Sequence, residues 1–201
     1  MAELKNICIF CGSSTGKNPA YVAAARALGT AIGREKLRLV YGGGGVGMMG
    51  EVARAVEGAG GEVLGIIPDF LVVREHAMQG AREIMVVPDM HERKRTMFER
   101  ADAFVALPGG IGTLEEAVEQ LAWVQLGRHK KPVLFANILG FWDPLLALLK
   151  HLGSEGYLYN GPGYLVAERI EDVLPKLRAA LRSVSEAELH GEAAKAVVEG
   201  M

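Results

Sequence analysis

The stretch LPGGIGTLEE, residues 107–116, joins a glycine-rich loop to the start of a predicted helix. Glycines before a helix N-terminus leave main-chain N–H groups free, a common way for a protein to hold a phosphate. Two adjacent carboxylates, Glu115 and Glu116, would repel such an anion. The two features are compatible if Glu116 points away from the phosphate, toward a part of the ligand that becomes positive.

A nucleoside 5′-monophosphate has both of these properties. When the bond between ribose and base breaks, the sugar becomes an oxocarbenium-like cation, and glycosidases meet that charge with carboxylates. A purely structural explanation is also open, because Thr113 and Glu116 fit a capping box, T-x-x-E, at the start of the helix. In that case the Glu116 side chain would bond to its own backbone.

A second stretch, DMHERKRTMFERADAF at residues 89–104, predicts a helix from about 90 to 101 with Asp89 as its N-cap. Arg93 and Lys94 fall on the same stripe as the apolar residues of this helix. Cations on an inward face require anions. These could be a ligand phosphate or a catalytic carboxylate. The alternative is that both side chains extend to solvent or pair with Glu99 or Glu115.

Glycine-bearing loops follow three predicted strands, at residues 11–16, 42–50 and 108–113. Ligands of open parallel sheets bind beyond the carboxyl ends of the strands, so these loops predict a nucleotide-sized site. Tight turns and close packing could also explain the glycines. The candidate ligand-binding residues of these loops are Ser13, Ser14, Gly43, Gly44, Gly45, Met49 and Gly109.

The loop at 42–50 also matches the dinucleotide pattern GxGxxG, with Asp69 about twenty residues later. However, this loop follows the second predicted strand, and Asp69 comes directly after Pro68, where a turn explains it. An NAD(P)-linked oxidoreductase is therefore kept only as an alternative.

These loops must be positioned by a regular alternation of strands and helices. We expect strands at 7–10, 37–41, 62–67, 84–87, 103–107, 132–137 and 164–167. We expect helices after Asn18 and Pro19 and at about 48–59, 90–101, 114–126, 142–152 and 171–183. Strands with continuous apolar runs are buried on both faces, which predicts an α/β fold with a doubly wound parallel sheet flanked by helices. We expect a single domain at 1–184 and a tail at 185–201, either helical or disordered.

Composition excludes several classes of protein. The formal net charge of −2 offers no basic field for nucleic acid. No apolar run reaches the ~18 residues of a membrane span, and the first residues lead directly into a strand, so we expect a cytoplasmic protein. Cys8 and Cys11 should face opposite sides of the sheet, and His91 has no metal-spaced companion, so we expect neither a redox pair nor a metal site.

Three motifs together resemble one known family. GGGGVGMMG, MHERK and PGGIGTLEE are similar to GGGxxGxMG, MHxRK and PGGxGTxxE, the signatures of the LOG ("lonely guy") proteins. The resemblance implies a Rossmann-like sheet, a homodimer and no cofactor. It also implies cytokinin riboside 5′-monophosphate phosphoribohydrolase activity, which cleaves N6-modified AMP into free base and ribose 5-phosphate; many bacterial members also cleave AMP. Members have also carried the label lysine decarboxylase, but nothing in this sequence identifies a cofactor-bearing lysine.

The resemblance also assigns roles to residues. Arg93 and Glu116 match the essential catalytic pair of the family. The remaining matches are to substrate-binding positions, namely Glu75, Lys94, Gly110, Ile111, Gly112, Thr113, Leu114 and Glu115. We expect Glu116 to stabilise the ribosyl cation and orient the attacking water. A guanidinium does not give up its proton, so we expect Arg93 to anchor phosphate or sugar and to hold Glu116 ionised.

The sequence departs from the plant members in two places. Ala122 stands where those members often have threonine, and the segment EHAMQGAREI at 75–84 differs from theirs. Recognition of the base therefore stays open. A nucleotide-binding module without turnover is a further alternative to the enzyme.

Overall fold

The computed structural model describes residues 3–72, 83–158 and 163–184. The predicted ligand residue Glu75 and the predicted tail at 185–201 lie outside these ranges. Seven parallel strands form one sheet in the order β4-β3-β2-β1-β5-β6-β7. The strands are β1 (Asn6–Phe10), β2 (Arg38–Tyr41), β3 (Glu62–Pro68), β4 (Glu83–Val87), β5 (Ala103–Ala106), β6 (Val133–Ala136) and β7 (Leu165–Ala167). Their bounds fall within two residues of those expected.

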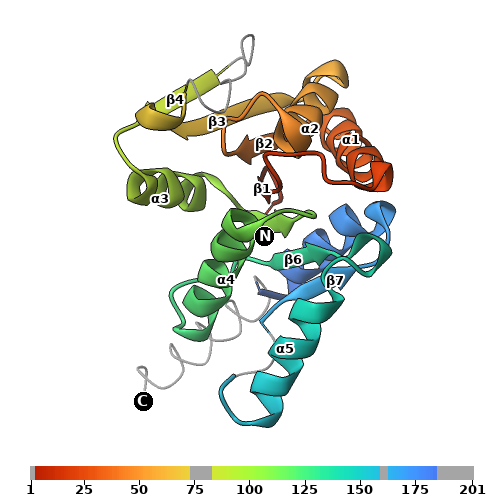
Figure 1. Ribbon diagram of the computed structural model, residues 1–201, viewed down its shortest axis with the longest axis vertical. Coiled ribbons are helices and arrows are strands. Elements are labelled where there is room, and N and C mark those ends of the chain that lie inside the picture. The colour runs from red at the N-terminus through yellow and green to blue at the C-terminus, as the bar shows by residue number, and fades with distance from the viewer. Residues whose placement is uncertain (1–2, 73–82, 159–162, 185–201) are drawn as a thin grey trace, which may run out of the picture.

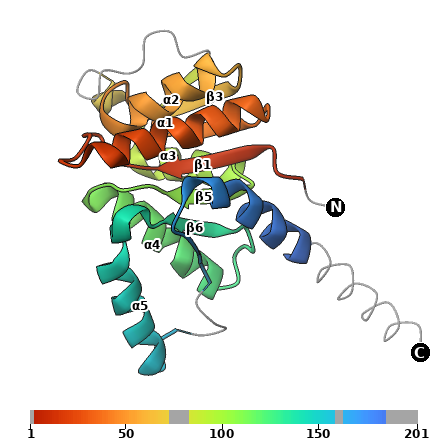
Figure 2. The same cartoon turned by 90° about the vertical axis from the view of Figure 1, so that its right-hand side faces the viewer.

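Helices cover both faces of the sheet, which confirms the predicted doubly wound α/β architecture (Figures 1 and 2). One face carries α1 (Pro19–Arg34), α2 (Gly47–Gly58) and the helix at 173–184. The other carries α3 (Met90–Arg100), α4 (Ile111–Gln125) and α5 (Asp143–Ser154). Cys8 packs in the core beneath α3 and α4, whereas Cys11 packs in the core beneath α1 and α2. The two thiols therefore face opposite sides, as expected from strand alternation.

Two of the predicted helix starts are confirmed by their caps. The side chain of Asn18 accepts a hydrogen bond from the N–H of Ala20, and Pro19 occupies the first turn of α1. The Asp89 carboxylate accepts a hydrogen bond of 2.8 Å from the N–H of Glu92 at the start of α3. These interactions are local, which is why the sequence predicts them.

The predicted capping box of α4 is wrong. The helix begins at Ile111 with Gly110 as its N-cap, and no side chain caps it. Thr113 is instead the third helical residue, buried at 4% exposure, and a Cβ at Gly109 would lie 2.2 Å from its hydroxyl. The helix therefore begins earlier than the capping pattern implies, with Thr113 packed against Gly109 in its first turn. Glu116 therefore lies in the second turn of α4, outside any N-terminal capping box.

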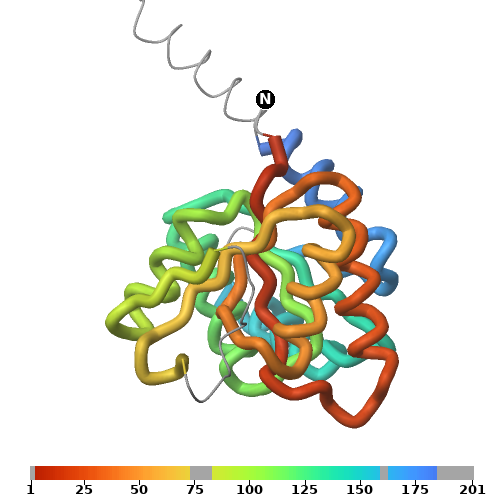
Figure 3. The backbone as a smooth tube through the Cα atoms, turned by 90° about the horizontal axis from the view of Figure 1, so that it is seen from above, coloured from red at the N-terminus to blue at the C-terminus, as the bar shows by residue number. Residues whose placement is uncertain are grey.

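The strand order reverses at β1, whose neighbours are β2 on one side and β5 on the other. Loops leaving these strands diverge at this point and open a crevice beyond the carboxyl ends. Seen from above, the loops after β1, β2 and β5 gather near one edge of the sheet (Figure 3). The topology thus brings the three predicted glycine loops together.

Candidate functional site

The three loops contact one another directly. The N–H of Gly12 donates a hydrogen bond of 3.2 Å to the carbonyl of Pro108, and the N–H of Met48 donates to the carbonyl of Ser14. Gly47 has φ +61°, and a Cβ there would lie 2.2 Å from the carbonyl oxygen of Ser13. These contacts hold the loop after β1 between the starts of α2 and α4.

A cleft of about 250 Å³ lies between these loops. It is lined by Gly12, residues 14–17 and 108–110, Tyr21, Met48 and Phe141. The helices α1, α2 and α4 begin in or directly after these loops, so their positive dipole ends and free N–H groups favour an anion here. Ser13 and Gly45 stand in the same loops, beside the cleft lining.

The glycines at the site divide into two groups. Gly43 has φ +78° and lies against Ile67. Its backbone conformation and its packing therefore explain why this residue is a glycine. In contrast, a Cβ at Gly110 or Gly112 would meet no described atom within 4 Å. Internal packing therefore does not require these two glycines, and the start of α4 leaves open space for a ligand.

Arg93 is buried, with 6% of its surface exposed. Its Nε donates to the carbonyl of Ile66 at 3.2 Å, and its Nη2 donates to the carbonyl of Gly42 at 2.9 Å. Its Nη1 donates to the sulfur of Met90 at 3.7 Å. The Arg93 side chain therefore neither extends to solvent nor pairs with Glu99 or Glu115. Because these three acceptors are uncharged, the guanidinium keeps its positive charge beside the loop after β2.

Glu116 is half-buried on α4, on the same side of the sheet as Arg93. Burial raises the pKa of the Cys8 thiol; the Glu116 carboxylate raises it further, and the Arg93 guanidinium lowers it. Burial and Glu116 also raise the pKa of Cys11, at the end of β1. The structure therefore brings the charges of Arg93 and Glu116, from two helices, to the same side of β1.

Lys94 forms ion pairs that tie α3 to α4. Its ammonium lies 2.6 Å from a carboxylate oxygen of Glu115 and 2.8 Å from one of Glu119, and its side chain is 15% exposed. Burial lowers the pKa of Lys94, but the hydrogen bonds to the two glutamates outweigh this effect and leave the pKa raised. The alternative that Lys94 pairs with Glu115 is therefore confirmed.

The other predicted residues differ in how deeply they are buried. Met49 is buried, and a Cβ at Gly42 would lie 3.2 Å from its sulfur and 2.0 Å from Nη2 of Arg93. Gly44 is buried beside them, whereas Ile111 is 82% exposed and Leu114 is half-buried on α4.

Sequence reasoning missed Lys17, Tyr21 and Phe141, all of which line the cleft. Lys17 lies in the loop between β1 and α1, and Tyr21 lies in the first turn of α1. Their closeness in sequence to a glycine-bearing loop could have indicated both residues. Phe141 precedes α5 and reaches the cleft only through the fold; its ring meets the Tyr21 ring edge-on, with centroids 5.4 Å apart. Nothing local in the sequence indicates that contact.

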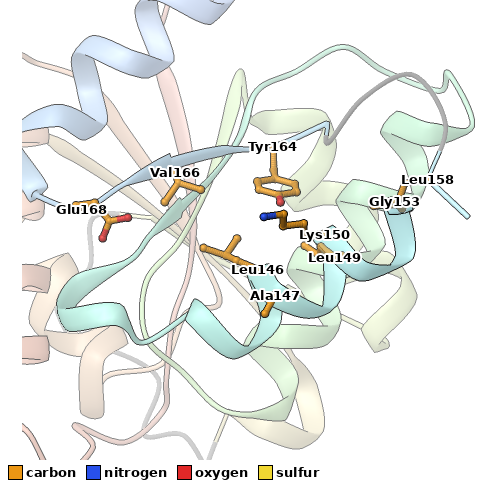
Figure 4. Close-up of a pocket in the computed structure, with 9 residues that line it drawn as sticks. All are labelled: Leu146, Ala147, Leu149, Lys150, Gly153, Leu158, Tyr164, Val166 and Glu168. Carbon is orange, nitrogen blue, oxygen red and sulfur yellow. The ribbon is translucent and has the colours of Figure 1, made fainter. Parts of the chain in front are cut away.

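A larger cavity, of about 650 Å³, lies elsewhere, between α5 and β7 (Figure 4). It is lined mainly by aliphatic side chains, with Lys150, Tyr164 and Glu168 among them. None of the predicted site residues within the described ranges lines this cavity.

Residues 3–72, 83–158 and 163–184 contain no cluster of three or more His, Cys, Asp or Glu side chains suited to a metal ion.

Together, the strand order and the crevice between the glycine loops define a Rossmann-like protein with a candidate site for an anion. The family model described as "Possible lysine decarboxylase" matches residues 49–176. Cytokinin riboside 5′-monophosphate phosphoribohydrolase LOG7 of Arabidopsis thaliana is 44% identical over 187 residues, which cover 93% of this chain and 84% of that protein. LOG5 of the same plant is 43% identical over 180 residues, covering 89% and 79%. The chain therefore belongs to the LOG family.

Solved structures support the fold at lower sequence identity. A molybdenum cofactor binding protein from Rippkaea orientalis superposes with a TM-score of 0.66 at 22% identity, over 89% of this chain and 98% of that one. The Moco carrier protein from Chlamydomonas reinhardtii gives a TM-score of 0.67 at 19% identity, over 90% of this chain and 99% of that one.

Within the described ranges, no helix combines the length and hydrophobicity needed to cross a membrane.

Proposed function

We propose that the protein hydrolyses the N-glycosidic bond of adenosine 5′-monophosphates, with or without an N6 substituent, to give the free base and ribose 5-phosphate. The names of the relatives LOG7 and LOG5 describe this class of activity. The observation that carries the proposal is the start of α4, where open space beside main-chain N–H groups suits a phosphate while Glu116 lies one turn further along.

In this proposal, Glu116 faces the anomeric carbon of the ribose. Its carboxylate stabilises the positive charge that develops there and orients the attacking water. The water oxygen bonds to the anomeric carbon as the bond to the base nitrogen breaks. The electron pair of that bond leaves with the base, which finally takes up the proton lost by the water.

Arg93 has an electrostatic role in the same step. Its bonds to Ile66 and Gly42 fix the guanidinium within the protein, so it keeps its charge and position through the reaction. In this proposal, that fixed positive charge stabilises the negative charge of the Glu116 carboxylate by attraction. A charge held in advance costs no reorganisation in the transition state.

We further propose that the protein is a homodimer that buries the outer face of α4. Ile111, Val118 and Leu126 are 82%, 40% and 80% exposed, and their spacing of seven and eight residues places them on one side of the helix. The exposed Ala122 lies between them. Several large apolar side chains exposed on one side of a helix are typical of a protein interface.

The oxidoreductase alternative has less support. The loop at 42–46 follows β2 rather than β1, and the Asp69 carboxylate accepts a hydrogen bond of 2.6 Å from the N–H of its neighbour Phe70. That bond gives Asp69 a turn-forming role, whereas a dinucleotide fingerprint would use it for a ribose.

The test is incubation with AMP and with N6-isopentenyl-AMP, followed by chromatography for free base and ribose 5-phosphate. We expect equal amounts of both products from each substrate that reacts. Nucleotide binding without release of base would instead show a binding module, and reduction of NAD(P)⁺ would show an oxidoreductase.

A further inference from the structure

Lys17 differs from the other cations near the cleft because its ammonium group is free to bind a ligand. It lies in the loop between β1 and α1, is exposed and lines the cleft. Within the part of the chain that the structure describes, its ammonium has no hydrogen-bond or ion-pair partner. Arg93, in contrast, donates to main-chain carbonyls, and Lys94 is held by Glu115 and Glu119.

Lys17 lies between two well-defined features of the backbone. Gly16 has φ +70°, a conformation that L side chains rarely adopt, and this turn leads the chain into the N-cap Asn18. A Cβ at Gly16 would lie 3.4 Å from the Tyr21 ring, so the turn is packed against α1. Lys17 is thereby placed between a fixed turn and a capped helix, next to the lining of the cleft.

A phosphate in this cleft needs more than main-chain N–H groups, because its charge approaches −2. Among the described residues that line the cleft, Lys17 carries the only formal positive charge. Ser14 and Thr15 add hydroxyl groups to the lining, and residues 108–110 lead into the N-terminus of α4. The cleft therefore combines helix N-termini with one free ammonium, which suits a phosphate monoester.

We propose that Lys17 binds the phosphate of the nucleotide substrate and so selects nucleoside monophosphates over nucleosides; this rests on the proposed function. The helix geometry is consistent with the assignment. With a rise of 1.5 Å per residue, Glu116 lies about 7.5 Å along the axis of α4 from Ile111. A phosphate at the helix start thus leaves room for the sugar beside the carboxylate.

The experiment measures equilibrium binding of AMP and adenosine by calorimetry, in the Glu116→Gln background so that the ligand is not consumed. Lys17→Met removes the charge, and Lys17→Arg retains it. Lys150→Met is the matched control, because Lys150 is an exposed lysine that lines the separate cavity between α5 and β7 (Figure 4). Thermal unfolding of each variant establishes that it is folded.

We expect Lys17→Met to weaken AMP binding about tenfold or more, as for the loss of a charged hydrogen bond, and to leave adenosine binding unchanged. Lys17→Arg should recover most of the affinity, and Lys150→Met should bind both ligands like its parent. Unchanged AMP affinity in Lys17→Met, or an equal loss for AMP and adenosine, would overturn the assignment.

The outcome for Lys17 is separable from that for the proposed reaction. If AMP binding depends on Lys17 but the unmodified protein releases no base, only the hydrolase proposal fails. If base is released but Lys17→Met keeps its AMP affinity, only the Lys17 proposal fails. Failure of the parent protein to bind AMP would overturn both.

Discussion

Nη2 of Arg93 donates a hydrogen bond of 2.9 Å to the carbonyl of Gly42, and the two residues are 51 positions apart in the chain. This bond joins α3 to the loop after β2. It also leaves no space for a side chain at position 42, since a Cβ there would lie 2.0 Å from the same nitrogen.

Gly42→Ala should therefore displace the Arg93 guanidinium from its site. We expect kcat for AMP to fall at least about tenfold, and the overpacked loop to lose about 1–3 kcal/mol of unfolding free energy. Gly58→Ala is the control, because a Cβ at Gly58 would meet no described atom within 4 Å. Full activity of Gly42→Ala would show that the position of Arg93 does not matter for turnover.

Glu116→Gln should separate chemistry from stability. Since Gly110 is the N-cap of α4, this substitution removes no cap, and we expect the unfolding free energy to change by less than the ~1 kcal/mol typical of a lost cap. Release of base should fall about 100-fold or more, because the neutral amide cannot stabilise a ribosyl cation. Glu99→Gln, at an exposed position of α3, is the control for a lost carboxylate. Unaltered turnover would leave Glu116 a structural residue.

Lys94→Met should loosen the contact between α3 and α4. The variant leaves Glu119 partly buried without its cation, so we expect a loss of about 1–3 kcal/mol of unfolding free energy. A double-mutant cycle with Glu119→Gln should give a coupling energy above about 0.5 kcal/mol. Weaker AMP binding at unchanged stability would instead support the substrate-binding role implied by the family resemblance.

His129 should make the fold sensitive to acid. Burial, and secondarily Lys131, lower its pKa from 6.5 to about 4, and the ring is only 8% exposed. The pKa is lower in the folded protein, so the unfolded chain takes up the proton first as pH falls. Stability is therefore complete above about pH 6.5 and declines toward pH 4, by about 2–3 kcal/mol at pH 4.5.

Denaturant unfolding at pH 7.5 and pH 4.5 measures this effect. His129→Asn keeps an acceptor for the N–H of Lys131, which bonds to Nδ1 of the native ring. The variant should lose less stability between the two pH values than the native protein does. His151→Asn, at an exposed position of α5, should behave like the native protein. An identical acid response of all three proteins would exclude His129 as the cause.

The proposed dimer predicts that charge on the outer face of α4 separates the subunits. Val118→Glu combined with Leu126→Glu should give a monomer by analytical ultracentrifugation, because two carboxylates would have to be buried in the interface. Leu148→Glu, at a 52% exposed position of α5, should leave the association state unchanged. A native protein that sediments as a monomer would refute the dimer directly.

The sequence by itself determined the elements and their order. Continuous apolar runs mark strands that are buried on both faces, and the caps Asn18 and Asp89 are interactions within a few residues, so a local pattern predicts them. The alternation of strand and helix then requires a parallel sheet with its glycine loops at the carboxyl edge. The three motifs were sufficient to indicate the family.

Only the tertiary structure decided where the charged side chains lie and which groups they bind. The T-x-x-E pattern is satisfied equally by a cap and by the interior of a helix that starts earlier. The structure has the second arrangement, with Thr113 packed against Gly109. Arg93 binds main-chain oxygens of Ile66 and Gly42, which carry no side-chain signal, and Lys94 binds Glu115 and Glu119 on a helix some twenty residues away. Such partners are set by how the strands are ordered and the helices packed, and a pattern of neighbouring residues does not contain that information.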